Sequence, residues 1–142
     1  MEPSIFTKII NKEIPATIVY EDDIVVAFLD NNPIHKGHTL VIPRQHVVNI
    51  FDADSETIAH MAVIAQKLAK AIKSTLNANG INIHMNNGEA AGQEVFHAHM
   101  HVVPRYINDQ SYQKPKRCSY NDTGEEATKL GMMISEAIEI RH

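Results

Sequence analysis

Three histidines alternate with apolar residues in the second half of the chain, in the run His97-Ala98-His99-Met100-His101. Residues two apart in a β-strand point to the same side, so this spacing predicts three imidazoles on one face and the apolar side chains on the core face. An imidazole that is neutral at pH 7 can act as a nucleophile, an acid, a base or a metal ligand. The run therefore indicates a reactive site rather than a solvated strand face.

The segment before the three histidines bears on which chemistry they serve. Catalytic zinc takes three protein ligands, usually oriented by carboxylates, and of Gly92, Gln93 and Glu94 just before the histidines only Glu94 could supply such a carboxylate. Phosphoryl transfer needs backbone N–H groups and neutral polar side chains to hold phosphate oxygens, and Gly88, Gly92 and Gln93 fit that need better. The residues favour phosphoryl transfer, and metal-dependent hydrolysis stays open as an alternative.

The elements that must position these histidines follow from periodicity and from turn residues. Residues 6–14 predict a short helix that ends before Pro15, residues 56–76 a long helix with Gly80 as its cap, and residues 125–138 a C-terminal helix that begins at a capping box from Thr123 to Glu126. The predicted strands are 17–20, 24–29, 38–42, 81–86 and 97–102. The last two should form an antiparallel pair, and Pro104 should end the second of them. The fold class is therefore α+β with about five strands.

Composition narrows the function classes. At 142 residues with 44% hydrophobic side chains, we expect one domain, 1–142, with a core of its own. The formal charge of −4 leaves no general basic surface for nucleic acid, and no apolar run is long enough to span a membrane. Cys118 is the single cysteine and the N-terminus has no secretion signal, so we expect a cytoplasmic protein without disulfides.

Several blocks of the sequence resemble the histidine triad (HIT) superfamily of nucleotide hydrolases and transferases. The run from His97 to Val103 is similar to its His-φ-His-φ-His-φ-φ signature, where φ is apolar. Further blocks resemble it in the same order: 4–10, 12–16, 28–30, 37–43 and 92–96. The resemblance covers residues 4–106, and the loop and helix of 107–142 are similar to those of prokaryotic-type members. It implies a HIT-like fold, with a five-stranded antiparallel sheet, a long central helix and a C-terminal helix, and a homodimer.

The resemblance also implies roles for particular residues. His99 would be the nucleophile, His101 would hydrogen-bond a phosphate oxygen or protonate the leaving group, His97 would orient its neighbours, and His38 would close the pocket from another strand. The implied nucleotide-binding residues are Asp30 for the ribose, Asn86, Gln93 and the backbone of Glu94 for the phosphate, and Ile5, Phe6, Ile9 and Phe28 for the base.

No metal or cofactor is expected. Some HIT proteins hold a structural zinc with two cysteines, a later histidine and the first triad histidine, and the two cysteine positions are similar to Ser4 and Thr7 in this chain. The later histidine matches His46. The other histidines carry no partner pattern, so we interpret His35, His60 and His142 as surface residues and His84 as a half-exposed strand residue. Residues 106–120, with Lys114, Lys116 and Arg117, are interpreted as a surface loop.

The expected function is hydrolysis of purine nucleoside phosphoramidates or related adenylyl conjugates through a covalent nucleotidyl-His99 intermediate. The nearest alternative is hydrolysis of dinucleoside polyphosphates, with the cations of the 106–120 loop meeting the extra phosphates. More distant alternatives are a metal-dependent hydrolase and a nucleotide-binding regulatory module. Glu94 stands where several relatives carry a serine, and an ionised carboxylate cannot donate to a phosphate. We therefore expect its side chain to turn away from the anion or to favour a cationic leaving group.

Overall fold

One antiparallel sheet organises the molecule, a computed structural model that describes residues 3–109, 117–121 and 124–140. Its strands are β1 (Ile18–Glu21), β2 (Val25–Leu29), β3 (Thr39–Pro43), β4 (Gly80–His84) and β5 (Met100–Arg105). They lie in the order β1-β2-β3-β5-β4, and each neighbouring pair is antiparallel. The predicted α+β class, the five strands and the antiparallel pairing of the two last strands are confirmed.

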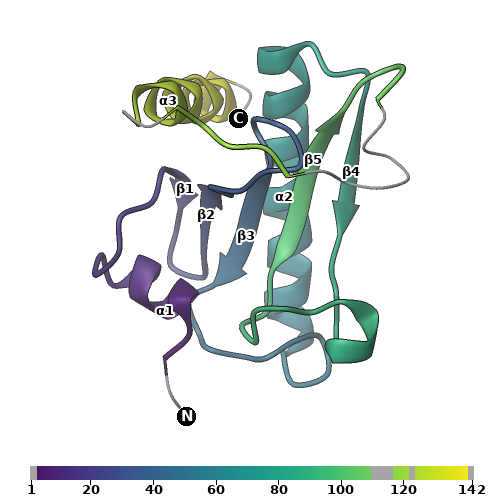
Figure 1. Ribbon diagram of the computed structural model, residues 1–142. Coiled ribbons are helices and arrows are strands. Elements are labelled where there is room, and N and C mark those ends of the chain that lie inside the picture. The colour runs from purple at the N-terminus through teal and green to yellow at the C-terminus, as the bar shows by residue number, and fades with distance from the viewer. Residues whose placement is uncertain (1–2, 110–116, 122–123, 141–142) are drawn as a thin grey trace.

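Two helices cover one face of the sheet. Figure 1 shows α2 (Ser55–Leu76) behind the sheet along β3 and β5, while α3 (Glu125–Ile140) crosses its upper end near β1. The three- and four-residue spacing of apolar side chains in both helices points one stripe inward, toward alternate residues of the strands. Fully buried members of this core include Met61, Leu68, Val41 and Ile134. This face carries most of the apolar core, and in the described part of the chain no helix is both long and apolar enough to cross a bilayer.

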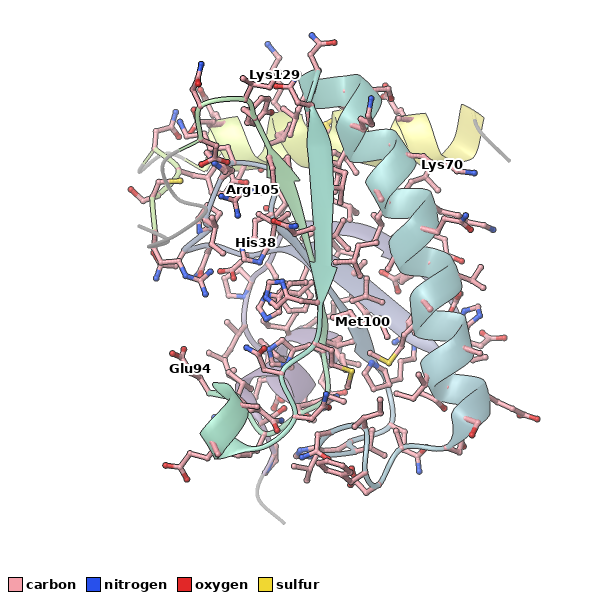
Figure 2. The ribbon with its side chains drawn as sticks, turned by 90° about the vertical axis from the view of Figure 1, so that its right-hand side faces the viewer. His38, Lys70, Glu94, Met100, Arg105 and Lys129 are labelled. Carbon is pink, nitrogen blue, oxygen red and sulfur yellow. The ribbon has the colours of Figure 1, made fainter. Side chains whose placement is uncertain are left out.

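The opposite face of the sheet is only partly covered, by the short helix α1 (Ile5–Ile10). A second apolar cluster forms beneath α1 from Phe6, Ile9, Phe28, Leu40 and residues beside them. In Figure 2 the sheet is seen nearly edge-on, with α2 on one side and the side chains of His38 and Glu94 on the other. Residues of α1 and of the strands on this second face line a pocket.

Two predicted helix ends are wrong. The first helix stops at Ile10 rather than at residue 14, because Asn11 caps it and Lys12 adopts a left-handed φ of 64°. The long helix ends at Leu76 with Asn77 in the left-handed conformation, so Gly80 begins β4 instead of capping the helix. Asparagine tolerates this conformation better than most residues, and it can therefore end a helix before the next glycine is reached.

The last strand is displaced from its predicted position. β5 begins at Met100, so His97 and His99 precede it, and it continues through Pro104 to Arg105. Pro104 is tolerated because β5 pairs with β3 only over residues 100–102, while residue 104 faces β4 alone. A proline lacks the N–H of a ladder, and it fits where one side of the strand is unpaired.

Candidate active site

A cavity with two adjoining lobes opens on the sheet face that carries α1. The first lobe, of about 510 Å³, is largely polar, and its lining includes Asp30, His84, Asn86, Glu94, His99, His101 and Arg117. The second lobe, of about 390 Å³, is mainly apolar, and its lining includes Ile5, Phe6, Ile9, Phe28 and Tyr120. Asp30, Ile5 and Phe6 line both lobes, so the two spaces meet at the end of β2.

His99 has one ring nitrogen committed and the other available. Its Nδ1 lies 2.7 Å from the backbone oxygen of His97. A carbonyl can only accept, so Nδ1 carries the proton and Nε2 keeps a lone pair when the ring is neutral. Burial lowers the pKa of His99 below its usual value, although the His97 carbonyl and the charge of Asp30 act in the opposite direction. The ring is therefore neutral at pH 7, lines the cavity and presents a nucleophilic nitrogen.

His97 is fully buried beside α1 rather than lining the cavity. Its Nε2 donates to the oxygen of Pro43 at 2.8 Å, and its Nδ1 accepts from the hydroxyl of Ser4 at 2.7 Å. Burial lowers the pKa of His97 to about 4, so the ring stays neutral. Both nitrogens are satisfied, and the ring holds in place the peptide whose carbonyl orients His99.

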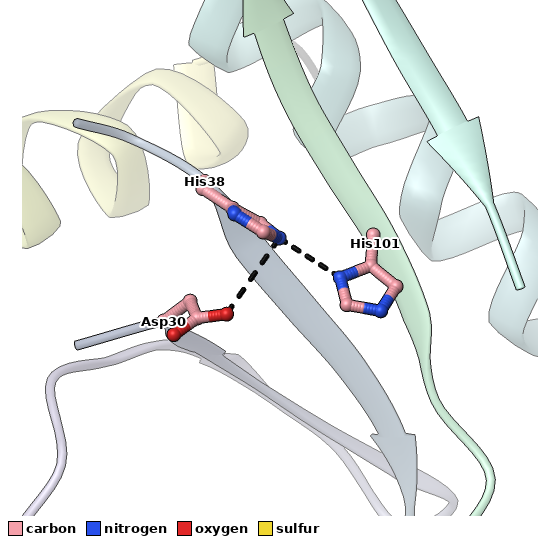
Figure 3. Close-up of side chains that lie close together, drawn as sticks. All are labelled: Asp30, His38 and His101. Atoms are coloured by element: carbon pink, nitrogen blue, oxygen red, sulfur yellow. Dashed lines mark hydrogen bonds and ion pairs between the residues drawn. The ribbon is translucent and has the colours of Figure 1, made fainter. Parts of the chain in front are cut away.

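His38 and His101 form a directed pair (Figure 3). The backbone N–H of Ile34 donates to His38 Nδ1 at 3.0 Å, which places the proton of a neutral His38 on Nε2. That Nε2 lies 2.9 Å from His101 Nδ1 and donates to it, so the proton of His101 is on Nε2. Burial is the main cause that lowers the pKa of His38 to about 3 and that of His101 to about 2. His101, which lines the cavity, therefore presents a hydrogen-bond donor there.

Gly37 helps to place the His38 ring beside His101. Its φ is 100°, and a Cβ at this position would collide with the side chain of Leu76 in α2. Glycine adopts this positive φ without strain, so it suits the connection between β2 and β3 that packs against the helix and leads into His38.

Asp30 sits where the two lobes meet. Its Oδ1 accepts from the backbone N–H of Asn32 at 2.9 Å, and its Oδ2 lies 3.3 Å from Arg117 Nη1 and 3.8 Å from His38 Nε2. Burial raises the pKa of Asp30, while the Asn32 N–H and the charge of Arg117 oppose that effect. The carboxylate is thus held by these contacts at the junction of the two lobes.

The remaining predicted binding residues divide into two groups. Asn86 and Glu94 line the polar lobe, and Ile5, Phe6, Ile9 and Phe28 line the apolar one. Gln93 lines neither lobe. It is buried, donates to the oxygens of Val48 and Val95, and accepts from the Gly88 N–H, so it braces the loop before the histidines.

Two further side chains that can carry charge line the polar lobe, although the resemblance implied no role for them. His84, the last residue of β4, stacks on His101 with ring centroids 4.4 Å apart and planes at 12°. Arg117 reaches the cavity from the C-terminal part of the chain. The alternation along residues 82–86 was the only signal for His84, since it shares a strand face with Asn86. Nothing local in the sequence indicates that Arg117 lies beside Asp30.

His35 and His60 were interpreted as surface residues without partners, and this is wrong. Each is half-buried, with His35 Nε2 at 2.6 Å from Asp109 and His60 Nε2 at 2.6 Å from Asp22. Both partners are distant in the sequence, which is why spacing gave no sign of them. His142, Lys114 and Lys116 lie outside the described residues.

One cluster among the described residues groups three potential metal ligands: Asp30, His38 and His101, with ligand atoms within 4.8 Å of one another. A metal needs a ring nitrogen with a free lone pair. His38 Nδ1 already accepts from Ile34, so its Nε2 would have to lose a proton from an otherwise neutral ring. The donors fit a hydrogen-bonded pair and do not fit a metal ion.

The region of the family's structural zinc site is also filled by hydrogen bonds. Ser4 and Thr7 lie beside His97 Nδ1 at 2.7 and 3.4 Å, and His46 stacks on the His97 ring with centroids 4.6 Å apart. Neutral hydroxyls are poor ligands for zinc compared with thiolates. His46 Nε2 donates to the Phe96 oxygen at 2.9 Å. These residues do not fit a zinc ion.

The sequence and the fold of this chain resemble those of known proteins. The model of the HIT domain matches residues 11–108. An uncharacterized HIT-like protein of Borreliella burgdorferi is 48% identical over 111 residues, which are 77% of this chain and 80% of that one. A hypothetical histidine triad nucleotide-binding protein from Sulfolobus tokodaii has a solved structure with a TM-score of 0.85, at 36% identity over 96% of this chain and 92% of that one. A Zn-bound histidine triad family protein from Mycobacterium smegmatis gives a TM-score of 0.82 at 37% identity, over 96% and 94% of the two chains.

Proposed function

The chain belongs to the HIT domain family, and from this premise we propose that it hydrolyses adenylyl conjugates, foremost purine nucleoside phosphoramidates, with His99 as the nucleophile. The observation that carries the proposal is the tautomer of His99. Its Nδ1–H is held by the His97 carbonyl, which leaves the lone pair of Nε2 for attack on the α-phosphate.

The two lobes suit a nucleotide laid across the end of β2. The apolar lobe takes the purine base, Asp30 accepts the ribose hydroxyls where the lobes meet, and the polar lobe takes the α-phosphate and the leaving group. Asn86 and the backbone N–H of Glu94 hold phosphate oxygens. Dipoles fixed in advance stabilise the charge of the transition state without reorganisation.

The chemistry proceeds in two displacements. His99 Nε2 forms a bond to the α-phosphorus while the bond from phosphorus to the leaving nitrogen or oxygen breaks, and water then cleaves the P–N bond to His99. The bound phosphate brings negative charge next to His101 and raises its pKa, so the His38–His101 pair takes up one proton from solvent. That proton passes to the leaving atom, and the attacking water later returns one.

The first test is an adduct experiment. The protein is mixed with adenylyl and guanylyl phosphoramidates and with dinucleoside polyphosphates. Intact mass is measured after a rapid quench in alkaline denaturant, because acid cleaves a P–N bond to histidine. We expect a nucleotidyl adduct on the wild type and none on His99→Asn. Turnover should resist a chelator. Two results would overturn the proposal. In the first, His99→Asn still hydrolyses the substrate and no adduct forms on the wild type. In the second, a chelator abolishes the activity.

The leaving group separates the phosphoramidate proposal from the dinucleoside polyphosphate alternative. Glu94 lies exposed on the rim of the polar lobe, and its negative charge favours a cationic amine over a further phosphate. In Glu94→Ser we expect a larger loss on phosphoramidates that carry an amine than on neutral ones. An equal loss of activity on both kinds of phosphoramidate would show that Glu94 does not select a cationic leaving group. Hydrolysis of dinucleoside polyphosphates would then stay open as the alternative.

We also propose a homodimer with the two sheets side by side. β4 is an edge strand, and Ile83 at its outer end is 47% exposed. An exposed edge of this kind pairs readily with a second copy. Light scattering should give twice the mass of 15.9 kDa, and a monomer at micromolar concentration would contradict it.

A further inference from the structure

A short segment near the C-terminus places a cation in the cavity. Arg117 Nη1 lies 3.1 Å from the Asn32 oxygen, 3.3 Å from Asp30 Oδ2 and 3.5 Å from His38 Nδ1. The side chain of Arg117 is 38% exposed, so the guanidinium sits at the mouth of the polar lobe. Arg117 takes no part in the two displacements at the α-phosphate.

The segment 117–121, termed here the C-terminal arm, is fastened along the connection between β2 and β3. The backbone N–H of Cys118 donates to the Pro33 oxygen at 2.7 Å. The backbone N–H of Gly37 donates to the hydroxyl of Tyr120 at 2.8 Å. With the Arg117–Asn32 contact these bonds hold the arm at three points, so the position of the guanidinium is built into the fold.

Asp30 needs a nearby cation because of where it lies. Its side chain is only 17% exposed, and burial raises the pKa of its carboxyl group. A protonated carboxyl would present one donor and a weaker acceptor, whereas an ionised one accepts hydrogen bonds at both oxygens. His38 is neutral and cannot supply charge, and the positive charge of Arg117 is one of the causes that lower its pKa. Within the described residues, Arg117 provides the permanent positive charge beside Asp30.

We propose that Arg117 is a positioning residue of the ribose site, which keeps Asp30 ionised and fixes its carboxylate so that the ribose hydroxyls meet an acceptor. This inference rests on the proposed function, in which Asp30 binds the ribose. Arg117 touches Asp30 through Nη1 alone, so lone pairs of the carboxylate remain for a ligand. In the opposite role, Arg117 would fill the site and would have to leave before a nucleotide binds. Removing Arg117 would then tighten nucleotide binding instead of weakening the preference for the ribose hydroxyls.

The experiment compares affinities for AMP and for 2′,3′-dideoxy-AMP by calorimetry, in wild type, Arg117→Met, Arg117→Lys and Asp30→Asn. We expect the wild type to prefer AMP by roughly tenfold, the size of a hydrogen bond to a charged acceptor. Arg117→Met should lose most of this preference, and Arg117→Lys should retain part of it. Arg117→Met combined with Asp30→Asn should lose little more than Asp30→Asn alone, because the two residues act through one contact.

Arg44→Met is the matched control. Arg44 also makes contacts to a carboxylate and a carbonyl, at Glu21 and Asp22, but on another part of the sheet. The Arg44→Met variant should have a lower melting temperature and the same preference for AMP as the wild type. In Arg117→Met, KM for a ribonucleotide substrate should rise with little change in kcat.

An unchanged preference in Arg117→Met, or tighter binding of both ligands, would overturn the inference while the proposed function stands. A wild type that binds neither ligand and forms no adduct would instead overturn the proposed function, and this inference with it. The melting temperature of each variant shows whether a lost preference comes from an unfolded protein. If Arg117→Met does not fold, the preference of Arg117→Lys decides the test.

Discussion

Two of the places where a histidine lies beside an aspartate show opposite results, one at Asp22 and one at Asp30. At one end of the sheet, His60 of α2 lies 2.6 Å from Asp22, and both side chains are a quarter to a third exposed, at 30% and 25%. In the cavity, His38 lies 3.8 Å from Asp30, with side-chain exposures of 0% and 17%. The first pair makes a direct hydrogen bond, whereas His38 turns its Nε2 to His101 instead.

The surroundings of the two carboxylates explain the difference. Asp22 accepts from the backbone N–H groups of Ile24 and Val25 and from the Tyr20 hydroxyl as well as from His60. These bonds outweigh its burial and lower the pKa of Asp22 to about 2. Around Asp30 burial prevails and raises the pKa. The same residue types therefore fasten the fold at one site and keep neutral, directed imidazoles at the other.

The largest predicted effect separates these roles by removing one histidine from each region. His99→Ala should reduce turnover by roughly four orders of magnitude or more, since no other group replaces the nucleophile, while nucleotide binding survives. His60→Ala should lower stability by about 1–3 kcal/mol because the Asp22 carboxylate loses a hydrogen-bond partner, with little effect on turnover. Single-turnover kinetics and urea unfolding of both variants check this. Comparable activity losses in the two would erase the distinction.

Acid should weaken the fold through two kinds of group, which begin to act at different pH values. His97, His38 and His101 have folded pKa values of about 4, 3 and 2 against 6.5 for the free side chain. Below pH 6.5 the unfolded chain binds more protons, so each of these contributes stability that is complete above that pH and falls by about 1.4 kcal/mol per pH unit as the pH drops toward its folded value.

Asp22 acts in a lower range. Its pKa falls from 3.8 to about 2, so its contribution is present above 3.8 and is lost as the pH falls through 2. Urea unfolding between pH 7 and 4 should show a steep loss in wild type and the same slope in Asp22→Asn. A stability that is flat from pH 7 to 5 would contradict neutral, buried histidines.

The rate of the chemical step should also depend on pH. His99 attacks through a neutral ring, and its pKa lies below the usual 6.5. The rate should therefore stay constant as the pH falls to 6.5, and it should drop about tenfold per pH unit below the pKa of His99. The charge of Asp30 raises the pKa of His99, so Asp30→Asn should move the acid limb to lower pH, whereas Asp22→Asn should leave it in place. Adduct formation in quenched flow gives the profile, and a shift in the opposite direction would exclude this coupling.

The smallest effect concerns the group behind the nucleophile. Ser4→Ala removes the donor to His97 Nδ1 and leaves only Thr7 at 3.4 Å, so we expect a loss in kcat of up to about tenfold. Ser4 also caps α1, and its loss lowers stability by about 1 kcal/mol. Asp54→Ala removes the cap of α2 in the same way, without touching a histidine. If both variants lower kcat equally, the effect is one of stability.

Local patterns predicted most of the fold. Apolar spacing located α2 and α3, and alternation located β4 and β5, because each pattern follows from the geometry of one element. The helix end at Asn77 was missed because an asparagine in the left-handed conformation competes with a nearby glycine, and the choice depends on packing.

The site was predictable where the resemblance to the HIT family supplied a position and was not where contacts are distant in sequence. His99, His101 and Asp30 line the cavity together, as the resemblance implied. Arg117 and Asp30 are 87 positions apart, and no periodicity relates them. Gln93 was expected to meet phosphate, but its amide hydrogen-bonds to the backbone of Val48, Val95 and Gly88 instead. Because Val48 is 45 positions away, this arrangement depends on the tertiary fold.

The late start of β5 has a consequence for protein engineering. His97 and His99 precede Met100, where the strand begins, and the His97 carbonyl is therefore free to hold the His99 ring. If the five-residue motif were grafted onto a regular strand of another scaffold, neighbouring strands would occupy such carbonyls and the middle ring could take either tautomer. A transplant that aims at activity must carry the irregular entry to the strand along with the histidines.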